Sequence, residues 1–274
     1  MMVGDVVGKP GRQAVMALVP RLRDYYEADF VAVNGENAAA GLGITRELAL
    51  EMLERACVDV ITLGNHAWAR KESHAYIGED LRVLRPANFP PGVPGRGNGI
   101  YSSPEGLVAV IVLQGRVFMD PIDDPFRVAD KLLAEARQAT RVILIDFHAE
   151  ASSEKQAFAW YVDGRASAVI GTHTHVQTAD ERILPGGTAY LTDVGMTGPI
   201  DSVIGMDRDV IINRFTTFMP TRFEVAPGPA RLCGVVIDVD THTGHATNIV
   251  RIQHTVEQDP GDPEDPGDGE SIRT

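Results

Sequence analysis

The chain has 274 residues, 44% of them hydrophobic, and carries a formal net charge of −13. This length and composition are typical of a globular protein with one large domain or two small ones. The acidic balance argues against a protein that a basic surface holds on nucleic acid, so we expect no stable nucleic-acid complex. Two cysteines make no disulfide framework, and we expect both Cys57 and Cys233 to be small buried apolar residues.

No apolar run reaches the roughly 18 residues that a membrane helix needs. The sequence also shows no secretory signal pattern. We therefore expect a cytoplasmic protein with no membrane partner.

The first two thirds of the chain alternate between strand-like and helix-like segments, which indicates βαβ units. A strand around Val3 precedes a predicted helix over 10–26, in which Pro20 predicts a kink or a split. Thr45 is the expected N-cap of a second helix. The remaining predicted elements are a strand over 30–34, a helix over 46–56, a strand over 58–63, two strands within 100–114, a helix over 125–139, a strand over 142–146, a helix over 154–162 and a strand over 168–171.

The last third favours strands and almost no helix. Strands are expected over 188–192, 222–225, 231–239 and 247–252, with a hairpin turn at 241–244. An alternating α/β core with extra antiparallel strands predicts an α/β fold with a mixed sheet or two packed sheets. The folded domain is expected to span 1–257. Residues 258–274 are rich in proline, glycine and acid, and we expect them to form a disordered tail.

Five short segments place metal-binding side chains where strands are expected to end. They are Gly4-Asp5, Gly35-Glu36-Asn37, Gly64-Asn65-His66, Asp146-Phe147-His148 and His173-Thr174-His175. Strand ends that meet at one edge of a sheet are where open α/β folds bind ligands. Such a set can hold two divalent metals, and two metals at one site suggest hydrolysis of a phosphate ester.

The ligand types narrow the choice of metal. In an extended segment, His173 and His175 would point the same way, and His148 follows a neighbouring strand. Imidazole and oxygen ligands without thiolate suit iron, manganese, zinc or nickel, and argue against Cu(I) and iron–sulfur clusters. Glu36 is the candidate for a carboxylate shared by two metals roughly 3.5–4 Å apart.

Several of these residues have a plainer interpretation when taken singly. Asp5 fits an Asx-turn before Gly8, and Asn37 fits a helix cap. Their placement at successive strand ends is what favours a joint role. His66 follows Asn65 by one residue, which suits either a proton donor to a leaving oxygen or a further metal ligand. The loop that begins at Asp193 suggests no role from sequence alone.

These segments closely resemble the calcineurin-like metallophosphoesterase superfamily and its YmdB-type branch. The resemblance runs from Val3 to about Ile252 through GDVVGKPGR, NGENAAAGLGIT, GNHAW, IDFHAEASSEK and GTHTHV. The superfamily pattern is DxH, GDxxD, GNHE, a lone His and GHxH. Here no His stands two residues after Asp5, Glu36 replaces the bridging Asp, GNHAW lacks the Glu, and Thr172 is an additional residue in the last motif. The branch shares these departures.

The resemblance implies a four-layer αββα sandwich of mixed sheets flanked by helices, and two divalent metal ions, iron or manganese. It implies one metal held by Asp5, Glu36, Asn37 and His175, and another held by Glu36, Asn65, His148 and His173. It also implies His66 as the general acid and a homo-oligomeric assembly.

The activity that the resemblance implies is hydrolysis of small nucleotide phosphodiesters, notably 2′,3′-cyclic nucleotides. A metal-bridging hydroxide would attack phosphorus while His66 protonates the leaving oxygen. Two alternatives stay open. One is a phosphomonoesterase or nucleotidase that uses the same site, and the other is a metal-dependent regulator that binds a nucleotide or RNA with little turnover.

Overall fold

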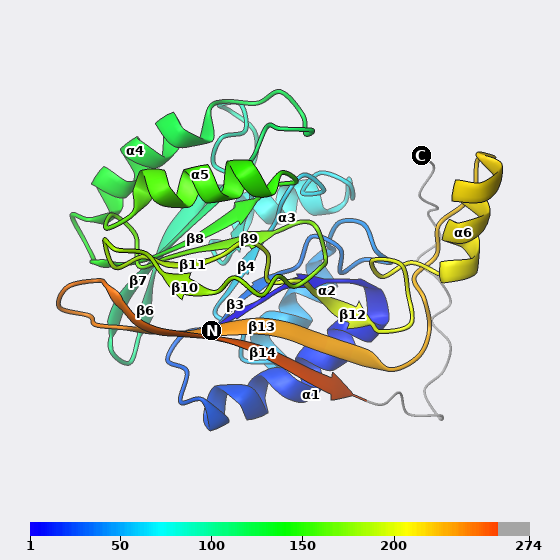
Figure 1. The fold of residues 1–274 in the computed structure, drawn as a ribbon, viewed down its shortest axis with the longest axis horizontal. Helices are drawn as coiled ribbons and strands as arrows, with labels where there is room; N and C mark the ends of the chain where they lie inside the picture. The colour runs from blue at the N-terminus through cyan, green and yellow to red at the C-terminus, as the bar shows by residue number, and fades with distance from the viewer. Residues whose placement is uncertain (257–274) are drawn as a thin grey trace.

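Two β-sheets pack face to face and carry helices on their outer faces (Figure 1). The computed structural model describes residues 1–256. The expected four-layer αββα sandwich is confirmed. The tail predicted over 258–274 lies outside the described residues.

The first sheet follows the order β2-β12-β13-β1-β3-β4-β5, and β14 pairs with β13. Its strands β1, β3, β4 and β5 are parallel neighbours, whereas β13 runs antiparallel to β1, β12 and β14. The strands are β1 (Met2–Val3), β2 (Asp5–Val6), β3 (Ala32–Asn34), β4 (Val60–Thr62), β5 (Val83–Leu84), β12 (Met196–Pro199), β13 (Ala230–Val239) and β14 (Ala246–Val256).

The second sheet follows the order β10-β11-β9-β8-β7-β6. Its central strands β7, β8, β9 and β11 are parallel, and the edge strands β6 and β10 are antiparallel to their neighbours. The strands are β6 (Asn98–Ser103), β7 (Gly106–Gln114), β8 (Val142–His148), β9 (Ala168–Thr172), β10 (Arg182–Ile183) and β11 (Ala189–Leu191).

The helices divide between the two outer faces. Those packed on the first sheet are α1 (Gly8–Tyr25), α2 (Arg46–Leu50) with its π-helical continuation η1 (Glu51–Arg55), and α3 (Ser73–Glu79). Those packed on the second sheet are α4 (Pro125–Ala136) and α5 (Ser152–Val162). Helix α6 (Arg208–Thr217) projects from the body of the molecule (Figure 1).

Three buried apolar layers hold this sandwich together. In β7, Ile111 faces the helices and its neighbour Val112 faces the other sheet, because successive side chains in a strand point to opposite faces. The helix-facing layer of the second sheet includes Phe147 and Phe158, whose rings stack with centroids 4.2 Å apart. Among the described residues, no helix is both long and apolar enough to cross a bilayer.

The structure corrects several sequence-based expectations. Pro20 does not split α1, which is continuous. The strand predicted over 222–225 is wrong, since Val225 forms only an isolated bridge with Met206. Helix α6 is absent from the sequence-based prediction because the segment lacks an apolar stripe. In the structure its Phe215 is exposed and Ile211 is buried.

The two cysteines differ in exposure. Cys233 is buried in β13, as expected. Cys57 is exposed, which makes its predicted burial wrong. It follows the end of η1 with a left-handed φ of 55°, so the chain turns there and the side chain leaves the apolar face.

A buried ion pair fixes the loop that follows β9. Lys155 Nζ donates to Asp193 Oδ2 at 2.6 Å and to the Thr172 carbonyl oxygen at 2.7 Å. Asp193 Oδ2 also accepts from the Thr174 backbone N–H at 3.1 Å. Since both side chains are almost fully buried, the pair ties helix α5 to the segment that contains His173 and His175.

We expect Lys155→Met to lower the free energy of unfolding by about 3–5 kcal/mol, because it leaves the Asp193 charge buried without its cation. Urea denaturation measures this loss. The control is Lys131→Met, which removes an exposed partner of Glu135 and should cost less than about 1 kcal/mol. Equal losses in the two variants would contradict a buried clamp.

Candidate metal centre

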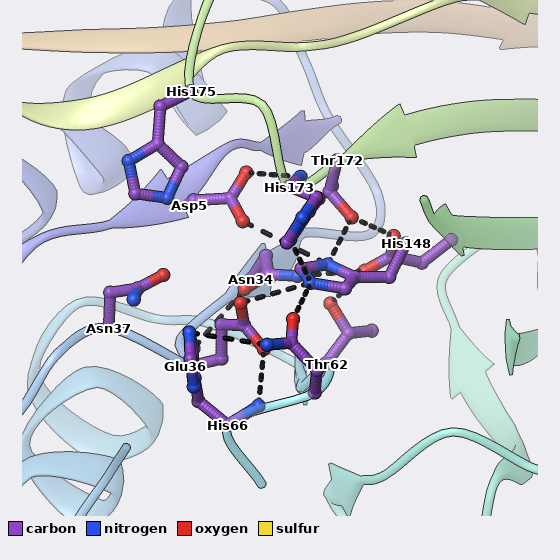
Figure 2. A network of polar contacts seen from close by, with 12 residues as sticks. Asp5, Asn34, Glu36, Asn37, Thr62, His66, His148, Thr172, His173 and His175 are labelled. Carbon is purple, nitrogen blue, oxygen red and sulfur yellow. Dashed lines mark hydrogen bonds and ion pairs between the residues drawn. The ribbon is translucent and has the colours of Figure 1, made fainter. Parts of the chain in front are cut away.

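The carboxyl ends of strands from both sheets meet at one edge, and the sequence-predicted residues lie there together (Figure 2). Asp5 begins β2, and His148 ends β8. The other residues occupy the loops that follow β3, β4 and β9, namely Glu36, Asn37, Asn65, His66, His173 and His175.

The tightest group is Glu36, His148 and His173, whose ligating atoms all lie within 4.8 Å of one another. His148 Nε2 is 3.0 Å from Glu36 Oε1 and 3.0 Å from His173 Nδ1. Asn65 Oδ1 lies 2.9 Å from the same His148 nitrogen. Three potential ligand atoms from three loops therefore converge around His148 Nε2 at the end of β8, and a cation there would be held by Glu36, Asn65, His148 and His173.

Asn37 lies on the side of Glu36 that faces away from His148 (Figure 2), whereas Asp5 Oδ1 is 4.0 Å from His148 Nδ1. Among the described residues, Asp5 Oδ1 and Asn37 Oδ1 are buried acceptors with no hydrogen-bond partner. A buried acceptor left unpaired costs about 1–3 kcal/mol, and more when it is charged. A cation would supply the missing partner, so these two oxygen atoms fit a metal site.

His175 lies beside Asp5 in the same view. Its Nδ1 is 2.9 Å from the Ile204 carbonyl oxygen. That contact occupies Nδ1, so the other ring nitrogen, Nε2, is directed toward Asp5 and Asn37 and could bind a cation there.

The expectation of an extended His173-Thr174-His175 segment is wrong. His173 has φ 99° and His175 has φ 65°, so both residues lie outside the extended region. The two rings consequently do not point the same way. His173 faces His148, and its Nε2 is 3.1 Å from Glu150 Oε2. Left-handed backbone at a non-glycine residue is costly, and the Lys155–Asp193 pair holds this loop in place.

Gly64 lets the two sheets approach at the centre. A Cβ at this position would collide with the His148 ring and with the Glu36 carboxylate. The requirement is for space and not for unusual backbone angles, since Gly64 has no positive φ. The Gly-Asn-His sequence therefore places Asn65 and His66 at the site while its glycine makes room for two ligands.

Charges at the centre favour an ion pair. Burial acts to lower the pKa of His148, but the charge and hydrogen bond of Glu36, with Asp5 and Asp146, outweigh it and raise that pKa to about 9. Burial acts to raise the pKa of Glu36, but His148 and His66 lower it to about 2. Burial raises the pKa of Asp5.

His66 borders the centre without facing it directly. Its backbone N–H donates to Glu36 Oε2 at 3.2 Å, and its Nε2 lies 3.3 Å from Asn65 Nδ2. Burial lowers the pKa of His66, and the charge of Glu36 opposes that change. The His66 ring is thus close enough to act on a small molecule bound by Glu36 and Asn65.

Sequence reasoning missed a buried polar group behind the ligands, formed by Asn34, Thr62, Asp146 and Thr172. Asp146 stands two residues before His148, so strand alternation could have placed it on the same face. The extra Thr172 in the last motif was a second signal.

Comparisons with known proteins identify the family of the chain. A profile of the YmdB-like protein family matches residues 1–252. The chain is 55% identical over 252 residues to a 2′,3′-cyclic-nucleotide 2′-phosphodiesterase of Bacillus subtilis, covering 92% of this chain and 95% of that protein. It is 37% identical to a putative phosphatase/phosphodiesterase of Mycoplasma pneumoniae, covering 94% and 93%.

Solved structures give the same result. A hypothetical protein from Thermus thermophilus has a TM-score of 0.87 at 44% identity, covering 94% of this chain and 98% of that one. A putative 5′-nucleotidase from Staphylococcus aureus has a TM-score of 0.56 at 16% identity, covering 92% of this chain and 50% of that one, and shares the fold alone. The resemblance drawn from the sequence is confirmed, and with it the enzyme class, a phosphoric ester hydrolase. The chain belongs to the YmdB-like family of metallophosphoesterases.

Proposed function

We propose that this protein uses two divalent metal ions, iron or manganese, to hydrolyse small nucleotide phosphodiesters, with 2′,3′-cyclic nucleotides as the first candidates. The convergence of Glu36, His148 and His173 beside the unpaired oxygen of Asp5 carries the proposal. The name of the Bacillus subtilis relative supports the substrate class. The net charge of −13 favours a small nucleotide over a long nucleic acid.

Two ligand groups share Glu36. The first group is Asp5, Glu36, Asn37 and His175, and the second is Glu36, Asn65, His148 and His173. Two bound cations would activate a water as nucleophile and offset charge on the phosphoryl group. Glu36, as the shared carboxylate, would reduce the repulsion between them.

His66 is the proposed general acid. To act so it must carry a proton when substrate is bound. Burial disfavours that form, whereas Glu36 and an anionic phosphate beside the ring favour it. The protonated ring would donate to the leaving oxygen of the ester.

The two rival functions differ in what they turn over. A phosphomonoesterase or nucleotidase would prefer the monoester product over the cyclic diester. A binding regulator would retain ligand and metal but release little product. A panel of cyclic diesters, linear diesters and monoesters, run with metal analysis of the purified protein, separates the three. A homo-oligomeric state and a cytoplasmic location stay predictions.

We expect Glu36→Gln to lower turnover by more than about 100-fold and to reduce the bound metal below two ions per chain. Glutamine keeps the shape of the side chain but lacks the charge that joins two cations. Metal analysis and turnover check this, with the exposed Glu47→Gln as control. Two metals and near wild-type turnover in Glu36→Gln would refute a shared carboxylate.

Metal binding should tighten as pH rises. The raised pKa of His148, about 9, means that the ring is protonated at neutral pH and must lose a proton to ligate. Apparent affinity should therefore increase about tenfold per pH unit for each proton released, and level off above pH 9. Calorimetric titration with Mn²⁺ in buffers of different ionisation enthalpy counts those protons. A pH-independent affinity with no proton release would contradict the assignment.

The role of His66 can be separated from that of a ligand. His66→Asn should retain two metals yet slow a ribose cyclic diester by about 10²–10⁴-fold, because its alkoxide leaving group needs a proton. A p-nitrophenyl ester needs little protonation and should be affected much less. The comparison variant His148→Ala should lose metal and slow both substrates alike. The same pattern in His66→Asn would make His66 a ligand.

A further inference from the structure

The Asp146 carboxylate is fully buried, and its hydrogen-bond partners are residues other than the proposed metal ligands. Its Oδ2 accepts from Thr62 Oγ1 at 2.5 Å and from Asn34 Nδ2 at 3.2 Å. Its Oδ1 accepts from Thr172 Oγ1 at 2.7 Å. Three donors therefore hold this carboxylate between the two sheets, two of them from strands β3 and β4 of the first sheet and one from β9 of the second.

Thr172 links this carboxylate to a proposed ligand. Its Oγ1 also lies 2.9 Å from His148 Nδ1. A threonine hydroxyl has one hydrogen to donate, and that hydrogen goes to Asp146. The Thr172 oxygen must then accept from a proton on His148 Nδ1, so this nitrogen carries the hydrogen and Nε2 faces Glu36 and Asn65.

Strand pairing builds the arrangement. Thr172 stands opposite His148 in the parallel β8–β9 register. Asp146 precedes His148 by two residues and so shares its face of the sheet. Thr172 is the additional residue that separates the last motif from the superfamily pattern, and its hydroxyl supplies the link.

We propose that His148, Thr172 and Asp146 form a relay in which Thr172 and Asp146 are positioning residues. The relay fixes the orientation and the Nδ1–H tautomer of His148 and strengthens its Nε2 as a metal ligand. Carboxylates and other acceptors behind ligating histidines act in this way in many metal sites. The inference rests on the proposed metal centre and adds a role that the two ligand groups do not contain.

The test measures Mn²⁺ affinity of metal-free protein for Thr172→Val, which has nearly the same shape but no hydroxyl. We expect one Mn²⁺ to bind about 10–100-fold more weakly. Thr172→Ser restores the hydroxyl and should bind within about threefold of wild type. The control is Thr188→Val, which removes an equally buried hydroxyl bonded to Ala166, far from the site. It should lower stability without changing Mn²⁺ affinity.

Asp146→Asn tests the other end of the relay. If the two residues act in series, Asp146→Asn combined with Thr172→Val should weaken Mn²⁺ binding by less than the product of the single effects. Wild-type affinity in Thr172→Val, failure of Thr172→Ser to restore binding, or an equal effect of Thr188→Val would overturn the relay.

A measurement on the unmutated protein tests the relay even if the variants fail to fold. When the protein is loaded with diamagnetic Zn²⁺ and labelled with ¹⁵N-histidine, its NMR spectrum should show His148 protonated at Nδ1 and metal-bound at Nε2. The opposite tautomer would overturn the relay. Wild-type protein that binds Mn²⁺ in the predicted way but hydrolyses no phosphodiester would refute the proposed function and leave the relay standing. Protein that binds no Mn²⁺ would refute both.

Discussion

Parallel alignment of the central strands in both sheets is the constraint on which the site depends. Parallel strands end at the same edge, and face-to-face packing brings the two edges together. Glu36 and Asn65 therefore come from the first sheet, and His148 and His173 come from the second. A centre of this kind needs no single continuous motif, because five separated segments each supply one or two side chains.

Buried carboxylates near this edge differ in how their charge is compensated. Asp193 has the Lys155 ammonium, Glu36 has His148, and Asp146 has three neutral donors. Asp5 accepts a hydrogen bond from the His173 backbone N–H at 3.4 Å. Its Oδ1 has no hydrogen-bond partner among the described residues and lies 4.0 Å from His148 Nδ1, a ring already paired with Glu36. Burying a charge without close partners is expensive, so Asp5, whose charge is the least compensated of the four, would gain most from a bound cation.

The loop after β9 has a strained backbone, and this backbone conformation sets the directions of the His173 and His175 rings. His173 and His175 both have positive φ, which an unsupported loop would not keep. Lys155 and Asp193 contact the loop from beneath, and Thr172 at its start contacts both His148 and Asp146. The same few residues therefore hold the backbone and orient the rings, so changes in stability and in metal affinity should be separable only with isosteric variants such as Thr172→Val.

Local patterns in the sequence determined the alternating elements, the apolar layers and the identity of the residues at the strand ends. These features follow from side-chain periodicity and motif spacing, which depend only on residues that are close together in the sequence. Tertiary structure alone decided the exposure of Cys57, the helix at α6, the divergent directions of His173 and His175, and the role of Asp146. The physical reason is the range of the contacts. Lys155 meets Asp193 across 38 residues and Asn34 meets Asp146 across 112, so neither pairing leaves a signal in a local segment.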